Sequence, residues 1–154
     1  MSQVFTLCGD DTITLNGHNL INFANDTVAQ LTFNSAVSTM TIGKSGSAIV
    51  ATNEQGKSAE LTVRIMRGSD DDKFLNAAFI TQKKDLVNAD LINGTIVRHI
   101  GQGISGGSVA RETTVLTGGI FTKQPDNQIN ISGDAEQGVV TYTLQFATGE
   151  RTLG

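Results

Sequence analysis

The sequence has few of the residues that support crosslinking, metal binding or membrane insertion. Its 154 residues include one cysteine, one proline, two histidines and no tryptophan. Cys8 alone can form neither an internal disulfide nor a cysteine-based metal site, and a lone thiol is typical of a reducing compartment. No apolar run approaches the roughly 20 residues of a membrane helix, and the N-terminus lacks the charged and apolar regions of a signal peptide. We therefore expect a protein of the cytoplasm that does not enter a membrane.

Charge is also scarce. Charged residues make up 17% of the chain, and the net charge is −4. Lysines and arginines are scattered, whereas a general nucleic-acid-binding protein needs them clustered against phosphates. The composition argues against that class of protein.

Few groups could carry out catalysis. A nucleophilic triad needs a base, and His18 and His99 are the only imidazoles. Neither stands in a recognisable signature. Acidic pairs, such as Asp10 with Asp11 or Asp134 with Glu136, lie in turn-like segments where solvated carboxylates are ordinary. The sequence therefore predicts no enzyme, no catalytic residue, no metal and no cofactor.

One glycine-rich stretch has the spacing of a nucleotide-binding motif. Residues 101–106, Gly-Gln-Gly-Ile-Ser-Gly, have the Gly-x-Gly-x-x-Gly spacing of dinucleotide-binding loops. That motif requires a strand before it and a helix after it, but residues 108–115 read as a strand and alternating βα units are absent. We interpret the stretch as a loop or a bent strand pair.

The residues that are abundant favour β-structure. The chain has 17 glycines and many threonines and asparagines, a composition typical of short strands joined by turns. Apolar and polar residues alternate over residues 12–15, 29–33 and 40–42. The clearest strand is C-terminal, because alternation places Val140, Tyr142, Leu144 and Phe146 on one face. A length of 154 residues suits one domain, 1–154.

Turn residues predict how two pairs of strands are joined. Asn16-Gly17 accepts the positive φ angles of a tight hairpin between residues 12–15 and 20–23. Residues 47–51 and 59–66 are expected to form a second pair, connected by the polar turn 52–57.

A single segment has the pattern of a helix. Phe74, Leu75, Ala78 and Phe79 share one helical face. Ser69 can cap the N-terminus, residues 70–72 are aspartates near the positive end of the helix dipole, and Lys83-Lys84 lie near its negative end. We predict an α-helix at about residues 70–83.

Three stretches in one order give the chain a family resemblance. They are residues 38–46 (Ser-Thr-Met-Thr-Ile-Gly-Lys-Ser-Gly), residues 60–65 (Glu-Leu-Thr-Val-Arg-Ile) and residues 73–77 (Lys-Phe-Leu-Asn-Ala). With the ending Thr152-Leu153-Gly154, the chain resembles tail tube proteins of contractile-tailed phages. The likeness covers roughly residues 10–85, and the glycine-rich stretch 101–107 has no counterpart in it.

The resemblance implies a mainly-β fold, an antiparallel β-sandwich or barrel with one flanking α-helix, similar to type VI secretion tube proteins. It also implies a structural subunit of the virion tail, assembled in the host cytoplasm. Its copies would form hexameric rings that stack into a conduit for DNA ejection. The implied partners are further copies, the tail sheath, the baseplate and the tail terminator, while DNA passes without specific binding.

By the same analogy, two segments are expected to contact neighbouring subunits. One is an extended N-terminal arm at residues 1–9, represented by Ser2, Gln3, Val4 and Phe5. The other is a hairpin around residues 45–57, represented by Ser45, Gly46, Thr52, Asn53, Glu54, Gln55, Gly56 and Lys57.

Two interpretations other than a tail tube protein remain open. Another virion component, such as a capsid decoration or baseplate protein, would be equally rich in strands. A β-sandwich adhesin or binding module is the third interpretation, but sugar recognition usually uses exposed aromatic rings, and alternation places Tyr142 inward.

Overall fold

The computed structural model describes residues 6–7, 11–24, 28–101, 110–127, 129, 131, 133 and 135–154. Within these ranges, ten strands, one α-helix and two short 3-10 helices follow one another. They are β1 (Thr6–Leu7), β2 (Thr12–Leu15), β3 (His18–Leu20), β4 (Ala29–Phe33), β5 (Ser38–Ile42), β6 (Ala48–Thr52), η1 (Glu54–Lys57), β7 (Ala59–Met66), α1 (Asp70–Lys84), β8 (Ile92–Gly101), β9 (Ala110–Lys123), η2 (Ala135–Gly138) and β10 (Val139–Leu153).

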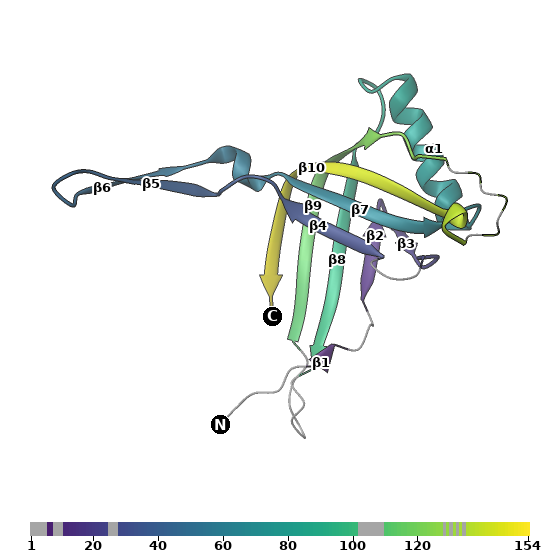
Figure 1. Cartoon of the computed structure of the whole chain (residues 1–154), viewed down its shortest axis with the longest axis horizontal. Helices are drawn as coiled ribbons and strands as arrows, with labels where there is room; N and C mark the ends of the chain where they lie inside the picture. Colours follow the sequence, from purple (N-terminus) through teal and green to yellow (C-terminus); the bar gives the residue numbers. More distant parts are fainter. Residues whose placement is uncertain are drawn as a thin grey trace.

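Eight of these strands form one antiparallel sheet, and two form a separate ribbon. The order in the large sheet is β3-β2-β8-β9-β10-β7-β4, with β1 paired to β8. Strands β5 and β6 pair only with each other among the described residues. Figure 1 shows the ribbon projecting far from the curved sheet, with α1 beside the sheet's other end. The mainly-β prediction, with one helix, is confirmed.

The core is centred on the pair β7 and β10. Their register places Leu61 opposite Leu144 and Val63 opposite Tyr142. Alternate residues of both strands are buried, because side chains of a strand point alternately to its two faces. Tyr142 is 1% exposed, so the sequence prediction that it points inward is confirmed.

The sheet curls back on itself at β7. The segment after β3 forms an antiparallel bridge between Phe23 and Ile65. On either side of it, the Ala24 N–H donates to the Arg64 carbonyl at 3.0 Å and the Met66 N–H donates to the Asn22 carbonyl at 2.9 Å. One edge of β7 therefore receives both β4 and the chain leaving β3, which gives the sheet its barrel-like closure.

Helix α1 begins and ends close to the predicted residues. The Ser69 side chain accepts the Asp72 N–H, and the three aspartates lie in the first turn. Leu75 is fully buried, and the Tyr142 hydroxyl donates to the Asp72 carboxylate, so the helix is held to β10. Burial raises the pKa of the Tyr142 phenol, and the nearby Asp72 raises it further. This helix is 15 residues long; no helix among the described residues is long and apolar enough to cross a membrane.

Asp71 connects the helix to the segment that closes the sheet. Its side chain is 1% exposed, and one oxygen, Oδ2, accepts the N–H groups of Ile21 and Asn22 at 2.6 Å each. The other oxygen accepts a hydrogen bond from His18 Nε2 at 2.8 Å, and the His18 ring stacks on Phe74 at 4.3 Å. Burial alone would raise the Asp71 pKa, but the hydrogen bonds from Asn22, His18 and Ile21 outweigh it and hold the pKa below its ordinary value.

One predicted hairpin is confirmed and one is wrong. Asn16 and Gly17 have φ of 49° and 80°, and they join β2 to β3 as the sequence predicts. The predicted pairing of residues 47–51 with 59–66 is wrong, because β6 pairs with β5 and β7 pairs with β10 and β4. The cause is burial: alternate β7 side chains need a partner with an equally apolar inner face, and β10 provides it, whereas every β6 residue is exposed.

We expect Asp71→Asn to lower the free energy of unfolding at pH 7 by about 2 to 3 kcal/mol, because a charged acceptor of three hydrogen bonds is lost. Denaturant unfolding measures this change. The adjacent Asp70→Asn is the matched control, since Asp70 is an exposed aspartate in the same helical turn.

The Asp71 contribution should also depend on pH. A carboxyl with a lowered folded-state pKa stabilises the fold above about pH 4 and loses that effect as the pH falls through the lowered pKa. The stability difference between wild type and Asp71→Asn should therefore shrink in acid. A difference that stays constant from pH 7 to pH 2 would contradict this role.

Candidate assembly surface

The β5-β6 ribbon is the most exposed part of the described chain. All ten residues of the two strands are exposed. In Figure 1 the ribbon extends away from the sheet and meets the body only at its base. A lone two-stranded hairpin is marginally stable in water, so we expect another protein surface to cover this segment.

The two faces of the ribbon differ. Met40 lies opposite Val50 and Ile42 opposite Ala48, so these four residues share one face, called here the aliphatic face, and Ser38 and Thr52 continue it at the base of the ribbon. Met40, Ile42 and Val50 are 63%, 66% and 62% exposed. The opposite face, called here the threonine face, carries Thr39, Thr41, Ile49 and Ala51.

A tight turn closes the ribbon at its tip. The Gly43 N–H donates to the Ser47 carbonyl at 2.7 Å, and the Gly46 N–H donates to the Gly43 carbonyl at 3.0 Å. Gly46 has a φ of +88°, a conformation that glycine adopts without steric cost. The tip also carries Lys44, which is the only charged residue between residues 38 and 52.

The base of the ribbon is held by backbone contacts. The Asn53 N–H donates to the Val37 carbonyl at 2.8 Å, and the Asn53 side chain accepts the Gln55 N–H at 3.2 Å. Gly56 is buried there, and a Cβ on it would lie 2.5 Å from the Ala36 carbonyl oxygen and 2.7 Å from the Val37 Cα. Only glycine allows the chain to pass this closely.

The structure places the predicted contact residues at three locations. Ser45 and Gly46 form the tip, Thr52 ends β6, and the five residues 53–57 form the base rather than a strand or turn of the hairpin. The hairpin thus spans residues 38–52 rather than 45–57. Ser2, Gln3, Val4 and Phe5 lie outside the described residues; of the expected arm at 1–9, Thr6 and Leu7 are described and pair with β8.

Sequence reasoning missed the aliphatic face. The alternation over residues 40–42 is typical of a strand with one buried face, but Met40 and Ile42 are exposed. The available signal was the run of 15 residues, 38–52, with a single charge. Such a run indicates a segment that another surface covers, but it does not identify that surface.

An apolar groove lies between β4 and the inner face of the sheet, and its volume is about 570 Å³. Its floor and walls are mostly aliphatic and aromatic: Ile13, Phe23, Leu31, Phe33, Leu61 and Ile96. Four charged residues, called here the groove rim, also line it: Asp11, Arg98, Glu112 and Arg151. Arg98 pairs with Asp11 at 3.5 Å, and Arg151 pairs with Glu112.

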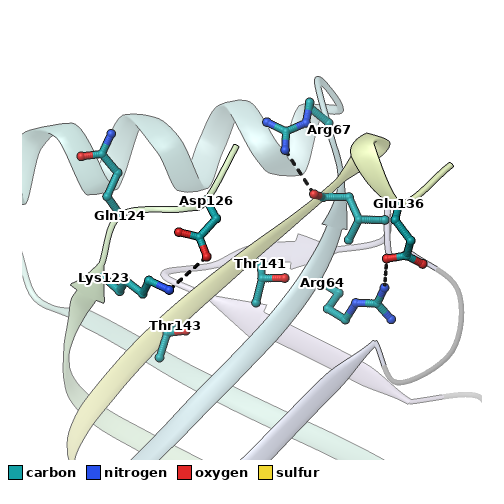
Figure 2. Close-up of a pocket in the computed structure, with 9 residues that line it drawn as sticks. Arg64, Arg67, Lys123, Gln124, Asp126, Glu136, Thr141 and Thr143 are labelled. Atoms are coloured by element: carbon teal, nitrogen blue, oxygen red, sulfur yellow. Dashed lines mark hydrogen bonds and ion pairs between the residues drawn. The ribbon is translucent and has the colours of Figure 1, made fainter. Parts of the chain in front are cut away.

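A second, polar pocket of about 220 Å³ is shown in Figure 2. Arg64 pairs with Glu136 at 3.0 Å and Lys123 with Asp126 at 3.0 Å. The Arg67 guanidinium donates to the Val139 carbonyl at 3.2 Å. The nine residues that the structure places around this pocket include no histidine, cysteine or serine.

The two histidines and the glycine-rich stretch are the remaining candidates from the sequence. His18 is the hydrogen-bond partner of Asp71, and His99 lies in β8 opposite Arg111. Within the described ranges, no three His, Cys, Asp or Glu side chains are grouped as metal ligands. Of the Gly-x-Gly-x-x-Gly stretch, Gly101 ends β8, and residues 102–109 lie outside the described residues.

Comparisons with known proteins give one family and one related structure. The family model described as "Bacteriophage PhiTE tail tube protein" matches residues 11–154. Among solved structures, the fold is similar to the anti-feeding prophage cap (AFP tube terminating cap), with a TM-score of 0.59 and 12% identity over 94% of this chain and 88% of that chain. No curated protein sequence matches the chain.

We expect Gly56→Ala to displace the base of the ribbon and to lower stability by about 1 to 3 kcal/mol, since the obstructing atoms belong to the backbone. Thermal unfolding should show a melting temperature lower by several degrees. Gly138→Ala is the matched control, because a Cβ there meets nothing within 4 Å. Equal melting temperatures for the two variants would contradict this account of the base.

Proposed function

The chain belongs to the bacteriophage PhiTE tail tube protein family, and we propose that it forms hexameric rings that stack into the conduit for DNA ejection. The family match over residues 11–154 carries this proposal. The likeness to the anti-feeding prophage cap, at 12% identity, supports the fold. Family membership also favours a structural role over an enzymatic one.

The polar face of the sheet is suited to line such a conduit. The face turned away from the core carries threonines from four adjacent strands: Thr12, Thr14, Thr95, Thr113, Thr141 and Thr143. Arg64 and Lys123 lie beside the last two, and each is paired with a carboxylate, Glu136 and Asp126. Hydroxyl groups are wetted by water but do not attract phosphate as lysine and arginine do. With a net charge of −4, the chain would not hold passing DNA.

The ribbon is suited to contact neighbouring subunits. Exposed strands offer unpaired N–H and C=O groups, and natural proteins usually protect such edges with charges or proline. The ribbon has neither, apart from Lys44 at its tip. Its exposed aliphatic face is unfavourable in water and becomes favourable when a partner covers it. The tail sheath, baseplate and terminator are further partners in this proposal, and the N-terminal residues 2–5 remain a predicted contact.

A tube-terminating protein is a second candidate, because the related structure is a cap. The two roles differ in how rings continue. A tube subunit adds ring upon ring, whereas a cap forms a ring that ends the tube.

Negative-stain electron microscopy of the purified full chain tests the proposal. A tube subunit should form rings at low concentration and tubes of variable length at high concentration. Isolated rings that never stack would favour the cap. A strictly monomeric particle at high concentration would contradict both.

We expect Ile42→Lys, on the aliphatic face, to abolish tubes and to shift the protein to smaller species, because a charge cannot be buried against an apolar partner. Thr41→Lys is the matched control on the threonine face of the same strand, and it should assemble far better. Sedimentation velocity and microscopy measure both variants. Equal loss of assembly in the two would contradict a face-specific contact.

A further inference from the structure

The aliphatic face and the apolar groove are two exposed apolar surfaces on different parts of one chain. We propose that the aliphatic face of one copy lies in the groove of the next copy, so that the ribbon is the segment that joins successive copies. This inference rests on the proposed self-assembly and adds to it the pair of surfaces that meet.

The groove has the chemistry to accept an aliphatic ribbon. Phe33 is 44% exposed although it is a large aromatic side chain, and the neighbouring Phe23 and Leu31 are only partly buried against the core. The volume of about 570 Å³ is enough for several side chains and lies within the range of binding pockets. Covering these residues removes apolar surface from water on both partners.

Charge favours this occupant over a charged one. The rim residues are already paired with each other, Arg98 with Asp11 and Arg151 with Glu112, so the rim has no net charge. The ribbon brings no charge of its own except Lys44 at the tip. Docking therefore leaves no ion without its partner, which is the usual penalty for burying a charged rim. The polar pocket of Figure 2 is a poorer match, because it is lined mainly by charged and hydroxyl side chains.

The arrangement dictates a head-to-tail contact. Figure 1 shows the ribbon extending away from its own body, and all ten strand residues are exposed, so the ribbon does not fill its own groove. A projection at one place and a recess at another make a heterologous interface, which continues from copy to copy. Such an interface produces rings when its rotation closes and open helical filaments when it does not.

Two variants, each with one defective surface, test the proposal. Val50→Lys alters the aliphatic face and leaves the groove intact, whereas Phe33→Glu alters the groove and leaves the ribbon intact. Each variant alone should stop at the smallest species. Mixed at equal amounts, they should form a complex of one species of each kind, with twice the mass, because one intact ribbon meets one intact groove.

Light scattering after size-exclusion chromatography measures the masses, and thermal unfolding checks that each variant folds. Val28→Lys is a second groove variant if Phe33→Glu does not fold, and Thr41→Lys controls for charge on the ribbon. If wild type assembles but the mixture gains no mass, or if the groove variant assembles normally, this inference is overturned while self-assembly stands. A wild type that stays monomeric overturns the proposed function together with it.

Discussion

The pairing of β7 with β10 provides most of the core around which the other elements are arranged. The two strands pair over eight consecutive positions, Val139 to Phe146 against Met66 to Ala59, and at the alternate positions that face the core, from Val140 to Phe146, apolar side chains lie opposite apolar side chains. Burial on one face is strong enough to set the register, because a slip of one residue would turn every inner side chain outward. Strand β10 then continues along β9 to the C-terminus, so one long strand connects the core pair to the rest of the sheet.

The closure of the sheet and the position of the ribbon both follow from the pairing of β7 with β10. Because β7 is occupied on one edge by β10, its other edge is left for β4 and for the segment around Phe23, and the sheet curls closed there. Asp71 stabilises that closure by accepting hydrogen bonds from two backbone N–H groups of the returning chain. The residues between β4 and β7 have no remaining place in the sheet and leave it as the ribbon. The ribbon therefore forms because both edges of β7 are already paired, which leaves residues 38–52 outside the sheet.

A ribbon of two strands has only one layer, so neither of its faces can be buried within the same chain unless it folds back. In this protein it does not fold back, and Met40, Ile42 and Val50 remain exposed. The groove beneath β4 presents apolar side chains that are also only partly covered. Both surfaces are understandable in a protein whose family builds tails, because a subunit that works in an assembly can leave for its neighbours the burial that a monomer must complete itself.

Local features were predicted well from the sequence. The turn at Asn16-Gly17, the cap at Ser69 and the alternation in 140–146 each depend on residues close together in the chain, and their geometry is set by φ preferences, capping and strand periodicity. The partner of residues 59–66 was predicted wrongly, because alternation says which face of a strand is apolar and does not say which other strand covers it. The Asp71 contacts were not foreseen either, since they join residues about 50 positions apart.

That the chain is mainly β, and where its helix lies, could be predicted from the sequence, because these features depend on composition and on short-range patterns. The sequence also carried the family resemblance in residues 38–46 and 60–65. The ribbon at residues 38–52 with its aliphatic face, and the apolar groove with a neutral rim under β4, became evident from the folded structure alone. The exposure of a strand depends on which other strand pairs with it, and that pairing depends on residues far apart in the chain that meet only in the complete sheet.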